Sequence, residues 1–159
     1  MAELEIGFTR ISPTHHRFAY QRPDGSGEVV EMETHGLLQH DLLHFVVETE
    51  AHLRGSFYGI LAKIGGYEEL RVAGGMALGG EIAITERVVG ALSEGLAQDD
   101  LDDEPLVAEV LACLDVYGEG RPRWLTPALV VAVRERMRQL EARWEAIPSG
   151  ETLRLAFPH

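Results

Sequence analysis

The chain has little of three things: cysteine, positive charge and long apolar runs. Its 159 residues include one cysteine, and 14 lysines and arginines stand against 26 aspartates and glutamates, for a formal net charge of -12. A single cysteine excludes an internal disulfide and is typical of a reduced compartment. We expect this residue, Cys113 in the apolar run LVAEVLACLDV, to be buried and unreactive. The acidic excess argues against nucleic acid, whose phosphates attract basic surfaces.

Long apolar runs are the third shortage. No stretch approaches the roughly 20 apolar residues that a membrane span needs. The first residues, MAELEIGFTR, lack the basic start and the apolar segment of a signal peptide. We therefore expect a cytoplasmic protein with no nucleic-acid or membrane partner. The 45% of hydrophobic residues is nevertheless enough for a buried core, and the length fits one domain over residues 1–159.

The two ends of the sequence have the pattern of half-buried strands. Residues 4–11 alternate apolar and polar side chains, and 17–21 and 29–33 do the same on either side of a turn rich in glycine. Residues 152–157 repeat the alternation. The pattern predicts a small antiparallel sheet made of the N-terminal strands and the C-terminal strand.

The middle of the sequence has helical spacing. The segment 65–80 contains six glycines but lacks the lysine that ends a phosphate-binding loop, so we expect a flexible connection there. The predicted fold class is α+β, with the sheet packed against a bundle of about four to five helices. The expected helices cover residues 37–53, 56–64, 81–97, 105–117 and 127–146.

The stretch from residue 40 to 52 is chemically unusual, because it holds three histidines and three carboxylates. At about 100° of rotation per helical residue, its metal-binding residue types fall inside a wedge of roughly 120°. The opposite side of the same helix is apolar and would pack into a core. The residues in the polar wedge are His40, Asp41, His44, Glu48 and His52.

This polar face predicts a site for one divalent ion: zinc, manganese or iron. His40 and His44 are four residues apart, so both imidazoles project from one helix face and can chelate one ion. Glu48 is a further candidate metal ligand, although it lies about 12 Å along the axis from His40, too far for the two to share an ion easily. His40 with His44, or His44 with Glu48, would then take another ligand from elsewhere. The candidates for that ligand are Glu68, Glu69, Glu81 and Glu86.

Two functions fit this face. In the first, metal-activated water drives a hydrolase-like reaction in which Asp41 and Glu48 are the catalytic residues. In the second, the protein binds or assembles without catalysis, and the same two carboxylates only hold His44 in place. The partner is then an unknown small molecule or protein, and the apolar stripe at 127–146 fits a core or a homo-oligomer interface equally well. The remaining histidines before this stretch are His15, His16 and His35, which flank strands and are expected at the solvated surface.

Two stretches support a family resemblance. HDLLHFVVE, from His40 to Glu48, is followed by GSFYGILAKIGG, from Gly55 to Gly66. Together they resemble a group of bacterial proteins of unassigned activity that share an HDLxHxxVE motif and an aromatic-glycine segment. HDLLH also resembles the metal-associated HDxxH motif of a helical family of ubiquinone-biosynthesis proteins. That second resemblance implies a metal ligand where this sequence has Ser56.

Overall fold

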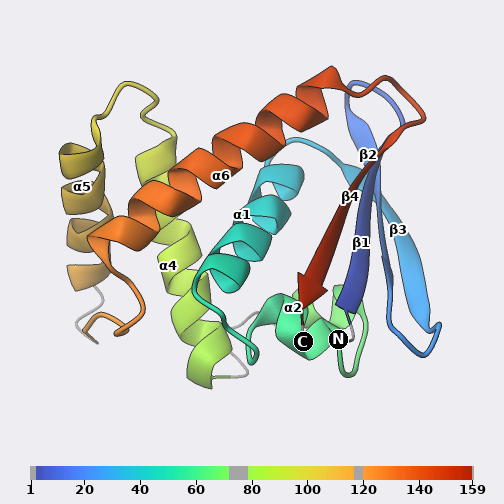
Figure 1. Cartoon of the computed structure of the whole chain (residues 1–159), viewed down its shortest axis with the longest axis horizontal. Coiled ribbons are helices and arrows are strands. Elements are labelled where there is room, and N and C mark those ends of the chain that lie inside the picture. Colours follow the sequence, from blue (N-terminus) through green and yellow to red (C-terminus); the bar gives the residue numbers. More distant parts are fainter. Residues whose placement is uncertain (1–2, 72–78, 117–119, 159) are drawn as a thin grey trace.

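The structure is a computed structural model that describes residues 3–71, 79–116 and 120–158. Both chain ends contribute to one four-stranded antiparallel sheet, and the helices cover one face of it (Figure 1). The predicted α+β class is therefore confirmed. The strands are β1 (Glu3–Arg10), β2 (His15–Gln21), β3 (Gly27–Glu33) and β4 (Thr152–Pro158), and the helices are α1 (Leu37–Glu50), α2 (Phe57–Leu61), α4 (Gly80–Leu96), α5 (Asp103–Asp115) and α6 (Pro127–Ala146).

The C-terminal strand joins the sheet of the N-terminal strands, as predicted, and the strand order β3-β2-β1-β4 places it beside β1. The register places Ile6 opposite Tyr20 on β2 and opposite Leu155 on β4. Because side chains alternate across a strand, these residues point to the same face and become the sheet side of the core. Leu4 and Phe8, on the same face of β1, have no exposed surface.

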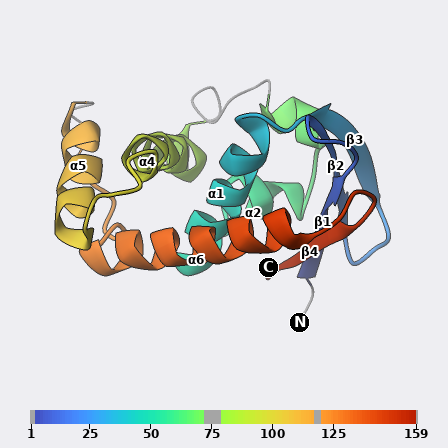
Figure 2. The ribbon, with the colours of Figure 1, turned by 90° about the horizontal axis from the view of Figure 1, so that it is seen from above.

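The helices form a second layer that extends away from the sheet (Figure 2). Helix α1 lies between the sheet and α4, and α5 packs on α4. Helix α6 packs across α1 and contacts α5. The α4–α5 approach is close, since a Cβ at Gly95 would lie 3.0 Å from Leu106 Cδ1. Within the described parts of the chain, every helix is too short or too polar to cross a bilayer.

Three local predictions need correction. Residues 67–71 of the expected flexible connection are helical, and Tyr67 is buried against the sheet with only 1% of its surface exposed. The rest of that connection, residues 72–78, lies outside the described residues. Helix α1 ends at Glu50 rather than near residue 53, because His52 adopts a φ of 55° and leaves the helix. Cys113 is half-buried rather than buried, with Sγ 3.3 Å from Glu94 Oε2.

The prediction that His16 is solvated is also wrong, because none of its surface is exposed. It lies two residues before Phe18 on β2, so strand alternation turns it toward the core. Its ring meets that of Trp144 edge-on, with 6.1 Å between centroids, and Nδ1 lies 3.1 Å from Thr34 Oγ1. Burial lowers the pKa of His16 because the charged ring loses its hydration.

Candidate metal site

The polar face of α1 is turned toward α4. Along this face the exposed fraction falls from 46% for the His40 side chain to 1% for His44 and 0% for Glu48. His40 and His44 lie one helical turn apart, and their ring centroids are separated by 4.7 Å. The predicted histidine pair is therefore brought together, with one ring at the surface and one inside.

Glu86 on α4 faces both histidines. Its Oε1 lies 3.0 Å from His44 Nε2, and its Oε2 lies 3.7 Å from His40 Nε2. One ligand atom from each of the three residues lies within 4.8 Å of the other two. His40, His44 and Glu86 thus form a group that could hold a metal ion, and Glu86 is the one of the four candidate glutamates that completes it.

The opposite nitrogen of each ring faces another carboxylate. His40 Nδ1 lies 3.5 Å from Asp41 Oδ1, and His44 Nδ1 lies 3.2 Å from Glu48 Oε2. Both rings therefore turn Nδ1 to a carboxylate on α1 and Nε2 to Glu86. In metal sites the second nitrogen of a histidine ligand is usually held this way, which fixes the tautomer and the ring direction.

Asp41 and Glu48 are themselves held by hydrogen bonds. The Tyr67 hydroxyl donates to Asp41 Oδ2 at 2.6 Å, and the Tyr58 backbone N–H donates to Glu48 Oε1 at 2.9 Å. Both carboxylates are buried. Asp41 contacts Nδ1 of His40, and Glu48 contacts Nδ1 of His44. Of the predicted ligand set, the structure therefore joins Glu48 to His44 but leaves it outside the three-residue group.

The distances within the group suit a single ion. His44 Nε2 is buried, and among the described residues it has no partner with hydrogen-bond geometry, although Glu86 Oε1 is 3.0 Å away. Metal bonds of about 2.1 Å place two ligand atoms about 3.0 Å apart at a right angle and about 3.4 Å apart at a tetrahedral angle. The separations of 3.0 Å from His44 Nε2 and 3.7 Å from His40 Nε2 are close to these values, but they end on different oxygens of Glu86. One ligand atom from each residue lies within 4.8 Å of the others, so the three side chains would draw together around an ion.

Without an ion, the carboxylates favour the protonated form of both histidines. Burial, the largest influence on His44, lowers its pKa, but the hydrogen bonds and charges of Glu48 and Glu86 outweigh burial and raise the pKa to about 9. Hydrogen bonds from Asp41 and Glu86 raise the pKa of His40. Burial alone raises the pKa of Glu86, yet the two histidines hold it well below its usual range. A divalent ion would replace the proton on His44.

The remaining candidates lie outside this group. His52 has left the helix, and Glu81 accepts a hydrogen bond from the Gly55 backbone N–H at 2.8 Å. Glu68 is exposed and pairs with Arg71, and Glu69 is exposed as well. Glu86 lies at the edge of the helical stripe of α4 that includes Ile82, Thr85 and Val89, but no signal in the sequence placed it ahead of Glu81. An acid on a buried stripe needs a partner, and His44 is that partner.

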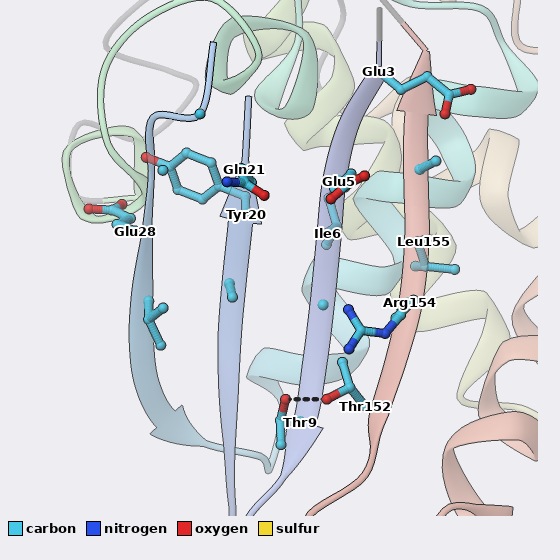
Figure 3. Close-up of a pocket in the computed structure, with 16 residues that line it drawn as sticks. Glu3, Glu5, Ile6, Thr9, Tyr20, Gln21, Glu28, Thr152, Arg154 and Leu155 are labelled. Carbon is cyan, nitrogen blue, oxygen red and sulfur yellow. Dashed lines mark hydrogen bonds between the residues drawn. The ribbon is translucent and has the colours of Figure 1, made fainter. Parts of the chain in front are cut away.

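A separate hollow of about 770 Å³ lies on the outer face of the sheet (Figure 3). Gly7 and Ala19 form part of its lining, and the helices lie behind the strands in this view. Glu5 and Arg154 project from neighbouring strands beside it. No member of the His40, His44 and Glu86 group lines this hollow.

Comparison with known proteins adds no further constraint. The chain matches no protein-family model, no curated protein and no solved structure. The resemblances of the HDLLH segment therefore stay predictions. The function has to be argued from the geometry around His44.

Proposed function

We propose that this chain is a divalent-metal protein in which His40, His44 and Glu86 hold one ion. The observation that carries the proposal is the common direction of the two imidazoles, with both Nε2 atoms toward Glu86 and both Nδ1 atoms toward carboxylates. Two imidazoles and one carboxylate suit zinc, manganese or iron(II) and leave positions for water and substrate.

The chemistry best suited to such a group is hydrolase-like. A bound ion would act as a Lewis acid and lower the pKa of water. Glu86 would supply negative charge to the ion, while Asp41 and Glu48 would keep both ring nitrogens directed at it. His40 and Glu86 have side chains that are 46% and 25% exposed, so the group opens to solvent on their side and a substrate would enter there.

The second candidate function is binding or assembly without catalysis. It is supported by the ion pairs themselves, because a protonated His44 satisfies both Glu48 and Glu86 in the absence of an ion. On this proposal the histidine face stabilises the α1–α4 contact, and the partner binds elsewhere.

Elemental analysis of protein purified without an affinity tag tests the two functions. The metal proposal expects about one equivalent of zinc, manganese or iron, and a rise in the thermal midpoint on adding the ion. At 100 times its Kd, a ligand stabilises a fold by about 2.7 kcal/mol. Less than about a tenth of an equivalent, with no thermal shift, contradicts the metal proposal and favours the second function. His40→Ala should lower the amount of bound metal. His52→Ala is its control and should not, because His52 is exposed and outside the group.

A further inference from the structure

The ligand group depends on how α4 is placed against α1, because the two histidines are on one helix and Glu86 is on the other. Hydrogen bonds that bear on this placement lie at the start of α4, beside its direct packing on α1. Glu81, five residues before Glu86, accepts the Gly55 backbone N–H at 2.8 Å through Oε1. Ser56 Oγ lies 3.2 Å from the same oxygen.

Ser56 and Thr85 add a buried contact between the same two segments. Neither residue has exposed surface, and their hydroxyl oxygens are 2.7 Å apart. Thr85 Oγ1 also lies 2.9 Å from the Glu81 carbonyl oxygen. The two hydroxyl protons serve three contacts, so Ser56 donates either to Thr85 or to Glu81. In both arrangements Ser56 is bonded to α4, either at Thr85 or at Glu81.

Helix α1 contacts the same short stretch from its other side. Glu48 Oε1 accepts the Tyr58 backbone N–H at 2.9 Å, while Glu48 Oε2 holds His44 Nδ1 at 3.2 Å. Residues 55–58, which we call the bridging segment, are thus bonded to one carboxylate from each helix that carries a ligand. The Glu48 carboxylate also contacts His44, and the Glu81 carboxylate lies shortly before Glu86.

We propose that the bridging segment sets the spacing of the ligand group, with Glu81, Ser56 and Thr85 as positioning residues. This inference rests on the proposed metal function and extends it. Glu81 acts through its acceptor oxygen, which fixes the first turn of α4 to Gly55 and Ser56. Glu86, little more than one turn further along, is thereby held opposite both histidines before an ion arrives. Preorganisation of this kind reduces the cost of binding.

Two substitutions of Glu81 separate positioning from charge. Glu81→Ala removes the acceptor, whereas Glu81→Gln removes the negative charge but keeps an oxygen that can accept from Gly55 and Ser56. Glu81 is exposed, so neither change opens a cavity in the core. The matched control is Glu94→Ala, which removes an exposed acid from the other end of α4.

The measurement is Co²⁺ affinity together with the visible absorption spectrum of bound Co²⁺, which reports ligand geometry. Glu81→Ala should weaken affinity about tenfold, at the lower end of the range for residues that support metal ligands, and should alter the spectrum. Glu81→Gln and Glu94→Ala should have a Co²⁺ affinity and a spectrum close to those of the unchanged chain. If Glu81→Ala and Glu81→Gln weaken Co²⁺ affinity equally, Glu81 acts through its charge and the positioning role is overturned. If Glu81→Ala leaves the affinity unchanged, the whole inference is overturned.

A second measurement keeps the two proposals apart. If the unchanged chain binds no metal, the proposed function fails, and the metal-free protein then decides the role of the bridging segment. The ¹⁵N resonance of His44 Nε2 reports its contact with Glu86. Glu81→Ala should shift that resonance while Glu81→Gln leaves it in place. A resonance that is the same in all three chains contradicts the positioning role.

Discussion

His16 and His44 are both buried, but their surroundings are opposite. His16 lies among Phe8, Trp144 and the hydroxyl of Thr34, and burial lowers its pKa. Burial also acts to lower the pKa of His44, yet two carboxylates reverse the result and raise it to about 9. Packing against the sheet therefore favours the neutral form of His16, and the carboxylates at the α1–α4 contact favour the protonated form of His44. Burial alone does not identify a candidate metal ligand.

The largest expected effect is on metal binding. His44→Gln should weaken zinc affinity by more than about 100-fold, beyond the range for residues that only support a ligand, because it removes one of three donors. His16→Gln should leave affinity unchanged, since His16 belongs to the sheet. Competition with a chromophoric chelator measures both. Comparable losses in the two variants would break the distinction between the histidines.

A smaller effect on zinc affinity is expected at Glu48, which contacts the Nδ1 side of the His44 ring. Glu48→Gln keeps the volume of a fully buried side chain but replaces the carboxylate that holds Nδ1 at 3.2 Å. We expect zinc affinity to fall by about tenfold to 100-fold, measured by the same competition. Glu50→Gln, on the same helix and outside the ligand group, is the control. If Glu48→Gln binds like the control, the carboxylate does not orient His44.

The pH dependence of stability tests the His16 side of the comparison. Its pKa is lowered in the fold, so the unfolded chain binds more protons once the pH falls below about 6.5, and folding weakens toward acid. His16→Gln should remove this part of the acid loss, which amounts to about 1.4 kcal/mol for each unit of pKa difference. Urea unfolding at several pH values measures the free energy of unfolding.

His35→Gln is the control for that series, because His35 is exposed. The comparison with the unchanged chain is needed because other groups titrate over the same range. The free energy of unfolding of His16→Gln could instead vary with pH in the same way as that of His35→Gln and of the unchanged chain. That result would show that the fold does not lower the pKa of His16.

The smallest effect is expected at Thr34. Thr34→Val removes the hydroxyl that lies 3.1 Å from His16 Nδ1 and should destabilise the fold by about 1 kcal/mol, the usual net value of such a bond. Thr14→Val at an exposed position should cost less. Urea unfolding measures both, and zinc affinity should be unchanged in each. Equal stability of the two variants would mean that His16 needs no partner at Nδ1.

The local sequence pattern was enough to predict the strands, the long helices and the pairing of His40 with His44 on one helix face. These features depend on alternation or on a four-residue step, which neighbouring residues determine. The same alternation could have placed His16 inside, since Phe18 and Tyr20 continue its side of β2. The prediction failed there because the expected strand began at residue 17, two residues after the start of β2.

Glu86 could be named from the sequence but not chosen over Glu81. Both acids lie near the start of α4, and only the packing of α4 on α1 turns one toward the histidines and the other toward Gly55. Helix spacing along one element carries no information about the distance to another. Residues 67–71 were missed for a similar reason: their helix is stabilised by tertiary contacts of Tyr67, while the surrounding glycines favour a loop.

The pairing of β1 with β4 has a consequence for the order of folding. Glu3 lies opposite Pro158, so two neighbouring strands come from opposite ends of the described chain, with all the helices between them. Closing so long a loop costs entropy before the contacts compensate for it, and topologies of this kind fold slowly. Helices α1 and α4 follow each other more closely in the sequence. We therefore expect the ligand group to assemble before the sheet closes, and metal added during refolding should act on the early phase.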